Sequence, residues 1–176
     1  MNAWVHLLNP KTPHNVGGAL RACSVYGAHT LTWTGQRVAD APMGAATTIA
    51  ARKWRPPREE RMKAYRDVDW GVEEGGLDRA ITAGFTPVCV EIVDEAESLV
   101  DFVHPAAAVY VFGPEDGSVP KGVRTVCHRF VMMPTKTCLN LAAAVNVVLY
   151  DRMAKAIRDG DLAPRWARMQ SMGSRR

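Results

Sequence analysis

Long apolar stretches are missing from this chain of 176 residues. No run of about 18 or more apolar residues occurs, so we expect no membrane-spanning helix. The N-terminal segment has neither a basic leader nor a long apolar core. We therefore expect a cytoplasmic protein rather than a membrane or secreted one.

Cysteine and metal-binding patterns are sparse as well. The four cysteines, Cys23, Cys89, Cys127 and Cys138, include no CxxC pair, and we expect buried or partly buried free thiols in a reducing compartment. Cys138 invites interpretation as a nucleophile, but no histidine is near it in sequence, which disfavours that role. The five histidines show no HxxxH or HExxH spacing, so we expect no metal site.

The usual nucleotide-binding fingerprints are also absent. The segment HNVGGAL at residues 14–20 contains two glycines, but it is not GxGxxG and has no P-loop lysine. An acidic residue to bind the ribose of a dinucleotide is missing too. We therefore disfavour a nucleotide-binding oxidoreductase.

The chain does have an ordinary globular composition with unevenly placed charge. Its hydrophobic content of 47% and charged content of 23% exclude wholesale disorder. The net charge of +4 includes two segments of +5 each, residues 51–66 and 152–176, which leaves −6 for the remainder. This asymmetry indicates a polyanionic partner, although two solvated surface segments are the alternative. Trp54, Tyr65 and Trp166 lie among the cations, where rings can stack on bases, and they favour nucleic acid.

Short apolar segments alternate with helical patterns along the chain. We expect strands at Trp4–Leu8, Thr30–Thr34, Pro87–Ile92, Ala107–Phe112 and Arg129–Met133. We expect helices at about Val16–Tyr26, Leu77–Ala83, Glu95–Phe102, Pro120–Val126 and Leu139–Arg158. The alternation predicts an α/β fold with a mostly parallel sheet and helices on both faces.

The length suits one compact domain. We expect it to cover residues 1–160, with a basic insert at about 51–66, and to be followed by a basic C-terminal tail at 161–176. Residues 35–76 have the weakest pattern, and we expect them to form a surface excursion.

Three strand-to-loop junctions carry polar residues that could meet at one edge of the sheet. The first, at residues 9–27 (NPKTPHNVGGALRACSVYG), contains Asn15 and Arg21 around a helix start. Asn15 fits a helix N-cap, whereas an arginine in an otherwise apolar helix either pairs with a buried carboxylate or faces a phosphate. The second, at residues 109–117 (VYVFGPEDG), places Glu115 just after a strand, where it could pair with Arg21.

The third junction, at residues 130–151 (FVMMPTKTCLNLAAAVNVVLYD), puts Cys138 and Asn140 at the entry to a long apolar helix. Exposed backbone N–H groups at that end favour a polar or anionic ligand group. A plain N-cap role for Asn140 is the alternative.

Together the three segments resemble the signature of the SpoU-type RNA ribose methyltransferases of the SPOUT superclass. That family has an Asn-x-Gly…Arg block, an apolar strand ending in Gly-x-Glu-x-x-Gly, and a Ser-Leu-Asn block that opens the final helix. The matching segments here are NVGGALRACSVYG, VFGPEDG and CLNLAAAV, in the same order. The resemblance covers about residues 3–158.

The resemblance implies a C-terminal trefoil knot, which periodicity cannot reveal because knots are nearly absent from proteins. It also implies a homodimer and S-adenosylmethionine bound in the knotted loops. By position, the cofactor would contact Val90, Gly113, Phe130, Met132, Cys138 and Leu139, mainly through backbone groups.

The resemblance further implies that Arg21, Asn15, Glu115 and Asn140 are the functional side chains. Guanidinium does not readily lose its proton, so we favour a role for Arg21 in binding the phosphate beside the target ribose and stabilising the developing alkoxide. Glu115 would orient Arg21, and the two asparagines would position backbone or ligand. The family usually has serine where this chain has Cys138, and short relatives usually have less in place of the insert at 51–66.

The function implied is an S-adenosylmethionine-dependent RNA 2′-O-methyltransferase acting on tRNA, because short relatives often modify the anticodon wobble ribose. An RNA-binding dimer of the same fold with weak or lost catalysis, through Cys138, is the alternative. Retention of Arg21, Glu115 and Asn140 favours the enzyme.

Overall fold

The computed structural model describes residues 2–38 and 66–161. The predictions for the basic insert at 51–66 and the basic C-terminal tail concern residues that, except for Arg66 and Asp161, lie outside the described ones. No helix within the described ranges is long and apolar enough to cross a membrane.

Seven parallel strands form one sheet within these ranges. They are β1 (Ala3–Leu7), β2 (Thr30–Trp33), β3 (Asp69–Val72), β4 (Thr86–Val90), β5 (Glu97–Ser98), β6 (Ala108–Phe112) and β7 (Arg129–Met132). Their order across the sheet is β3-β2-β1-β6-β4-β7-β5. Because every pairing is parallel, the carboxyl ends of all the strands meet at one edge of the sheet.

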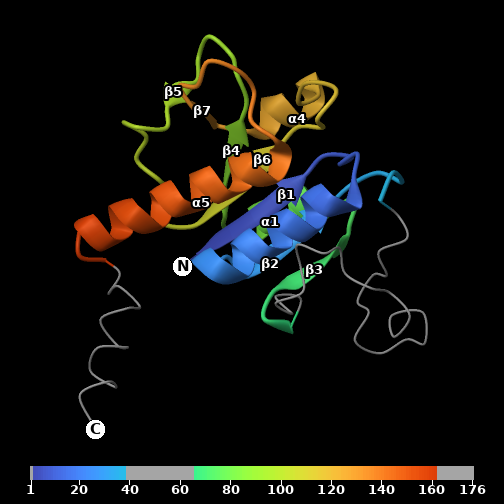
Figure 1. The fold of residues 1–176 in the computed structure, drawn as a ribbon, viewed down its shortest axis with the longest axis horizontal. Helices are drawn as coiled ribbons and strands as arrows, with labels where there is room; N and C mark the ends of the chain where they lie inside the picture. Colours follow the sequence, from blue (N-terminus) through green and yellow to red (C-terminus); the bar gives the residue numbers. More distant parts are fainter. Residues whose placement is uncertain (1, 39–65, 162–176) are drawn as a thin grey trace, which may run out of the picture.

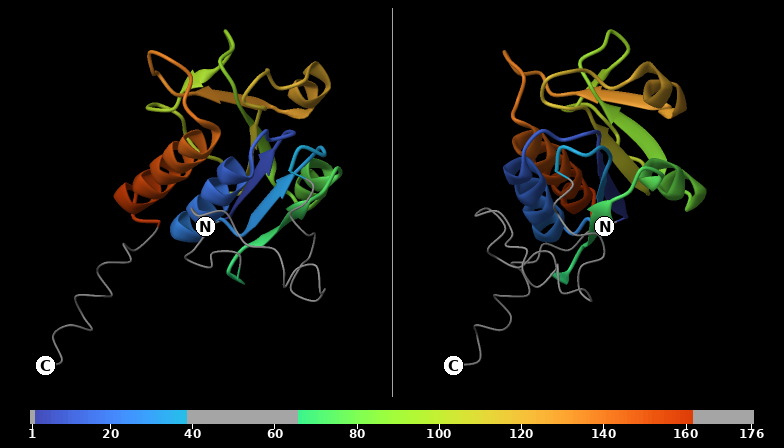
Figure 2. Two further views of the ribbon diagram at one scale, coloured as in Figure 1. Left: turned by 45° about the vertical axis from the view of Figure 1, so that its right-hand side comes forward. Right: turned by 90° about the vertical axis from the view of Figure 1, so that its right-hand side faces the viewer.

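Helices cover both faces of this sheet. They are α1 (Pro13–Tyr26), α3 (Gly76–Thr82), α4 (Lys121–Val126) and α5 (Leu141–Arg158). Helices α1 and α5 lie side by side in front of the sheet (Figure 1), and the view turned by 90° shows α3 and α4 on the opposite face (Figure 2). The predicted α/β fold with a parallel sheet between two helical layers is therefore confirmed.

The central strand β6 shows why this sheet needs helices on both faces. All five of its residues are buried. Ala108, Tyr110 and Phe112 belong to the hydrophobic cluster that includes α1 and α5, whereas Val109 and Val111 belong to the cluster that includes α3. Alternate residues of a strand face opposite sides, so a continuously apolar strand is stable only when both sides are covered.

Helices α1 and α5 are in close contact at Gly18. A Cβ atom placed on Gly18 would lie 2.8 Å from the Cβ of Ala142, at the start of α5. Glycine and alanine at this crossing let the two helix backbones approach, and the approach brings the N-terminal turns of both helices to the same edge of the sheet.

Two cations of the segment 152–176 belong to the interior of the fold. Arg152 is 7% exposed and donates hydrogen bonds to three backbone carbonyls and to the hydroxyl of Tyr110. Lys155 donates to two further carbonyls and forms an ion pair with Asp151 at 2.7 Å. These side chains fix the C-terminal half of α5 to the sheet, so their charge is satisfied within the protein.

The predicted helix at Glu95–Phe102 is wrong. The segment forms turns and the short edge strand β5, and Leu99 N–H donates to the carbonyl of Met132, the last residue of β7. Leu99 and Phe102 are both buried, and their three-residue spacing also fits a single turn, closed here by Phe102 N–H and the carbonyl of Ser98. Pairing with β7 outweighed the local helix propensity.

The prediction that residues 35–76 form only a surface excursion is also wrong in part. Strand β3 extends the sheet beside β2, with Thr30 opposite Asp69 and Trp33 opposite Val72. The ring of Trp70 on β3 stacks on the buried ring of Trp33, with centroids 6.1 Å apart. Only the tertiary structure provides this apolar partner, which explains why the short segment gave no clear signal alone.

Candidate active site

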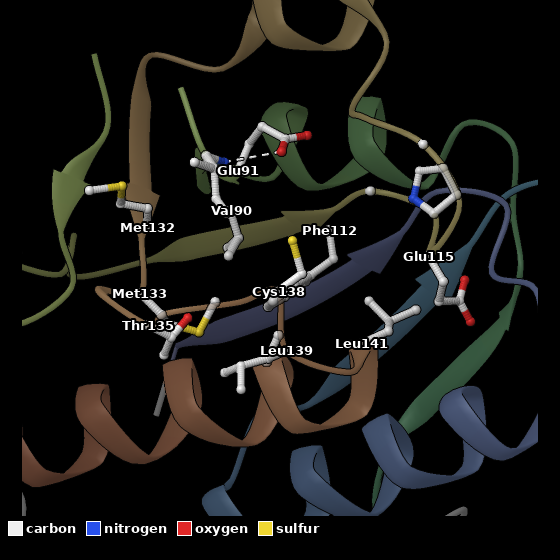
Figure 3. A pocket seen from close by; sticks show the side chains of 15 residues that line it. Val90, Glu91, Phe112, Glu115, Met132, Met133, Thr135, Cys138, Leu139 and Leu141 are labelled. Atoms are coloured by element: carbon white, nitrogen blue, oxygen red, sulfur yellow. Dashed lines mark hydrogen bonds between the residues drawn. The ribbon is translucent and has the colours of Figure 1, made fainter. Parts of the chain in front are cut away.

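A cleft opens at the carboxyl ends of β4, β6 and β7, above the first turn of α5 (Figure 3). The cleft has a volume of about 170 Å³ and is partly open to solvent. The residues that line it are Val90, Glu91, Ile92, Phe112, Gly113, Pro114, Glu115, Gly117, Met132, Met133, Thr135, Cys138, Leu139, Leu141 and Ala144. The site thus lies where ligands bind in parallel α/β sheets.

Five of the six residues predicted to bind the cofactor line this cleft: Val90, Gly113, Met132, Cys138 and Leu139. Phe130 is not among the lining residues. It packs against the hydrophobic cluster of Cys89 and Val111, on the sheet face that α3 covers. Phe130 is the second residue of β7, and only the last residue of that strand, Met132, reaches the cleft at the carboxyl end of the sheet.

Glu91 lines the cleft, and our sequence analysis did not identify it. One carboxylate oxygen accepts a hydrogen bond from Val119 N–H at 2.8 Å, and the other accepts from Ile92 N–H at 3.0 Å. The first bond ties the loop after β6 to the end of β4. A Cβ atom on Gly113 would lie 3.2 Å from Val119, so this loop packs closely. Glu91 follows a strand directly, as Glu115 nearly does, and the same rule applied to β4 would have found it.

Asn140, Asn15 and Glu115 form a chain of hydrogen bonds at one end of the cleft. Asn140 is the N-cap of α5, as the alternative interpretation predicted, and its side-chain oxygen accepts from Ala142 N–H and Ala143 N–H. Its amide nitrogen donates to the side-chain oxygen of Asn15 at 2.9 Å. The amide of Asn15 in turn donates to the Glu115 carboxylate. Asn15 thus contacts two residues that are far away in sequence: Glu115, 100 positions later, and Asn140, 125 positions later.

Asn15 is not the N-cap of α1, contrary to the local interpretation of its sequence. The helix begins at Pro13 with Thr12 at the N-cap, so Asn15 lies inside the first turn. Proline is favourable at this position because its missing N–H would be unsatisfied anyway. The Asn15 side chain is 8% exposed and is committed to Glu115 and Asn140.

Both oxygens of Glu115 have partners on the β1–α1 connection. One accepts from the Asn15 amide, and the other accepts from Lys11 N–H at 2.8 Å. These contacts, rather than the predicted pairing with Arg21, are what fix the carboxylate. Arg21 is exposed on α1, six residues after Asn15 and so about 120° away around the helix axis.

The neighbouring Asp116 joins two loops at the same edge of the sheet. It forms an ion pair with Arg37 at 2.7 Å and a longer one with Lys11 at 3.7 Å. The Arg37 guanidinium holds the pKa of Asp116 below its ordinary value, with Lys11 adding a smaller effect. The loops after β1, β2 and β6 are therefore tied together beside the cleft.

Cys138 is exposed, contrary to the expectation of a buried or partly buried thiol, whereas Cys23, Cys89 and Cys127 are buried. Figure 3 shows the Cys138 side chain pointing away from α5 into the cleft. Within the described residues no group of three or more His, Cys, Asp or Glu side chains is arranged to hold a metal ion.

Comparison with known proteins identifies relatives of this chain. A solved TrmH/SpoU tRNA modifying enzyme from A. aeolicus is similar over 90% of this chain and 77% of its own, with 17% identity and a TM-score of 0.71. The SpoU methyltransferase AviRb from Streptomyces viridochromogenes, solved with AdoMet, has 22% identity and a TM-score of 0.66. The similarity extends over 88% of this chain and 60% of the AviRb chain.

A third structure, which concerns the 2-OH methylation of C/U34 on tRNA, has 20% identity and a TM-score of 0.60. The similarity extends over 88% of this chain and 97% of that structure's chain. At these identities the likeness shows a shared fold. No curated protein matches the chain. The sequence model described as the SpoU rRNA Methylase family matches residues 2–150. The chain therefore belongs to the SpoU rRNA Methylase family.

Proposed function

We propose that this protein transfers a methyl group from S-adenosyl-L-methionine to the 2′-hydroxyl of an RNA ribose, and that the RNA is a tRNA. Family membership makes it an RNA methyltransferase. The observation that carries the finer proposal is the chain Asn140–Asn15–Glu115, three polar side chains from distant segments held together at one end of the cleft.

The lining of the cleft suits S-adenosyl-L-methionine chemically. Its walls are largely apolar, from Val90, Phe112, Met132, Leu139 and Leu141, and suit the adenosine ring. Backbone groups at the strand ends and in the loop before α5 would hold the polar edge of that ring. When bound, the cofactor supplies an electrophilic methyl group on a sulfonium sulfur.

The polar side chains act by binding and positioning. Glu115 holds the β1–α1 connection, and the Asn15–Asn140 contact holds that connection against the start of α5. Arg21, further along α1, binds the phosphate beside the target ribose and stabilises charge that develops on the 2′-oxygen. Holding the reacting oxygen in one geometry supplies much of the acceleration.

We further propose that the protein is a homodimer with the C-terminal trefoil knot typical of its family. Helices α1 and α5 lie side by side and expose Val25, Val147 and Tyr150, which are 57%, 39% and 56% exposed. A second copy could cover these apolar side chains. Sedimentation equilibrium tests the dimer, and a Tyr150→Glu variant should shift it towards monomer.

Transfer of labelled methyl from S-adenosyl-L-methionine to bulk tRNA and to rRNA, followed by nucleoside mapping, tests the activity. We expect a 2′-O-methylated nucleoside in tRNA. Label in rRNA alone would contradict the choice of substrate, and a methylated base would contradict the 2′-hydroxyl as acceptor. No label in either RNA, with RNA binding retained, would favour the RNA-binding dimer with lost catalysis.

A further inference from the structure

The charge of the cleft differs from that of the surrounding surface. Among its lining residues are two carboxylates, Glu91 and Glu115, and no lysine, arginine or histidine. A ligand in this cleft therefore lies near negative side chains, without a basic side chain of the described wall to offset them.

The partners of these two carboxylates are neutral. Glu91 accepts hydrogen bonds from the N–H groups of Ile92 and Val119, and Glu115 accepts from Asn15 and from Lys11 N–H. Neither forms an ion pair with a lysine or arginine within residues 2–38 and 66–161.

Other carboxylates in the same ranges do have cationic partners. Asp116 pairs with Arg37, Glu97 with Arg129, Glu73 with Arg79, and Asp151 with Lys155. Backbone N–H groups fix the orientation of a carboxylate but leave its net charge in place. The two carboxylates of the cleft thus keep a charge that a cationic ligand can use.

From this we infer that Glu91 makes the cleft selective for the charged cofactor over the neutral product. The inference rests on the proposed function. The sulfonium, ammonium and carboxylate of S-adenosyl-L-methionine give it a net charge of about +1 at neutral pH. When the S–CH3 bond breaks and the O–CH3 bond forms, the sulfonium becomes a neutral thioether and the hydroxyl proton leaves. S-adenosyl-L-homocysteine has therefore lost the charge that the carboxylates attract.

Glu91 is the better residue for testing this selectivity. Glu115 belongs to the hydrogen-bonded chain with Asn15, so its replacement would disturb the site's geometry. Glu91 lies on the opposite wall, at the end of β4, and its carboxylate stands above Val90 in Figure 3. A full charge close to a ligand cation, in partly solvated surroundings, changes affinity by about threefold to tenfold.

Calorimetric titration with three ligands tests the inference without any catalysis. These are S-adenosyl-L-methionine, S-adenosyl-L-homocysteine and sinefungin, whose amine replaces the sulfonium and is cationic at neutral pH. The wild-type protein should bind the two cations more tightly than the homocysteine compound. In Glu91→Gln the new NH2 group faces Ile92 N–H or Val119 N–H, so all three ligands should lose some affinity, but the two cations should lose about threefold to tenfold more than the neutral ligand. Added salt should reduce the difference in affinity between the cationic and neutral ligands in the wild-type protein.

Two further variants separate charge from structure. Glu91→Asp keeps the charge, so it should keep the ratio of affinities even if a shifted Val119 loop weakens all three ligands. Glu97→Gln removes a carboxylate that is paired with Arg129 and does not line the cleft, and it should leave the ratio unchanged.

Three results would overturn the inference. The wild-type protein could bind the neutral ligand as tightly as the cations, or Glu91→Gln could lower the affinity for all three ligands equally. The third is a change of the affinity ratio in Glu97→Gln equal to that in Glu91→Gln. Wild-type protein that binds none of the three would instead overturn the proposed cofactor, and the inference with it.

Discussion

The side-chain amide of Asn140 donates a hydrogen bond of 2.9 Å to the side-chain oxygen of Asn15. The direction of this bond is fixed from both ends. The oxygen of Asn140 already accepts from two N–H groups of α5, so its nitrogen must face Asn15. The nitrogen of Asn15 then faces Glu115, whose two oxygens only accept. The order of donors and acceptors is thus set from the start of α5 to Glu115.

Replacing Asn140 with aspartate separates its two roles. Aspartate caps a helix as well as asparagine does, so the contribution of the cap to the free energy of unfolding should change by less than about 0.5 kcal/mol. Its carboxylate cannot donate to the side-chain oxygen of Asn15, so two acceptors face each other. If the Asn15 amide turns around to donate to the aspartate, its oxygen then faces the Glu115 carboxylate, and two acceptors again meet. We expect methyl transfer to fall about 100-fold. Asn140→Ala should lose the cap as well, costing about 1 kcal/mol more in thermal unfolding. Wild-type turnover in Asn140→Asp would contradict this account.

Glu115→Gln should be nearly as damaging as Glu115→Ala. Both oxygens of Glu115 accept hydrogen bonds, and a glutamine would turn its NH2 group towards either the Asn15 amide or Lys11 N–H. Two donors facing each other cost about as much as a missing acceptor. Steady-state methyl transfer should therefore fall about 100-fold in both variants. Glu97→Gln, at an exposed residue, is the matched control. A fully active Glu115→Gln would show that the β1–α1 connection does not need two hydrogen-bond acceptors at residue 115.

Arg21→Ala should greatly reduce turnover and leave cofactor binding nearly intact. Arg21 is exposed on α1 and does not line the cleft, so its truncation removes no wall of that site. We expect methyl transfer to fall about 100- to 1,000-fold. Arg21→Lys, which keeps the charge but not the planar fork, should be intermediate. Calorimetry with S-adenosyl-L-methionine checks the binding, and a large loss of cofactor affinity would assign Arg21 a different role.

Cys138→Ser should be tolerated and should raise activity if the family's hydroxyl contacts ribose or cofactor. The thiol is exposed and points into the cleft, and a hydroxyl is smaller and a stronger hydrogen-bonding group. Because the site is exposed, the free energy of unfolding should change by less than about 0.5 kcal/mol. Methyl-transfer kinetics on the two proteins make the comparison, and complete inactivation of Cys138→Ser would mean that the thiol has a specific function.

His6 should make the protein less stable in mild acid. It is 1% exposed, and its ring nitrogen Nδ1 lies 2.7 Å from the hydroxyl of Thr32 on the next strand. Burial lowers the pKa of His6 from 6.5 to about 4, and the nearby carboxylates of Glu73, Glu74 and Asp78 only partly oppose this. The unfolded chain therefore binds the proton more readily, and stability that is complete above about pH 6.5 is lost as the pH falls towards 4.

Urea unfolding at a series of pH values measures this loss, which should reach about 3 kcal/mol. His6→Gln can still hydrogen-bond to Thr32 but cannot titrate, so its stability should fall less steeply over the same range. Burial also lowers the pKa of His104, and that contribution has the same sign and remains in both proteins. Parallel curves for wild type and His6→Gln would contradict the role of His6.

Much of the fold could be read from the sequence because its signals are local. The apolar runs of β1, β2, β4, β6 and β7 are short and bounded by turn residues, and their predicted limits lie within two residues of the observed ones. The Asn140 cap of α5 is likewise a local signal. The predicted helix at Glu95–Phe102 failed, and strand β3 was missed, because both segments take their structure from a neighbouring strand.

By itself, the sequence determined the alternation of strands and helices, the start of α5 and the three junctions that carry the polar residues. The tertiary structure decided which of these residues meet. Asn15 and Asn140 come into contact because Gly18 lets α1 approach α5, and Glu115 turns to Lys11 N–H and Asn15 because parallel pairing of β1 with β6 sets their loops side by side. Hydrogen bonds between residues 100 or more positions apart depend on packing that no local pattern encodes.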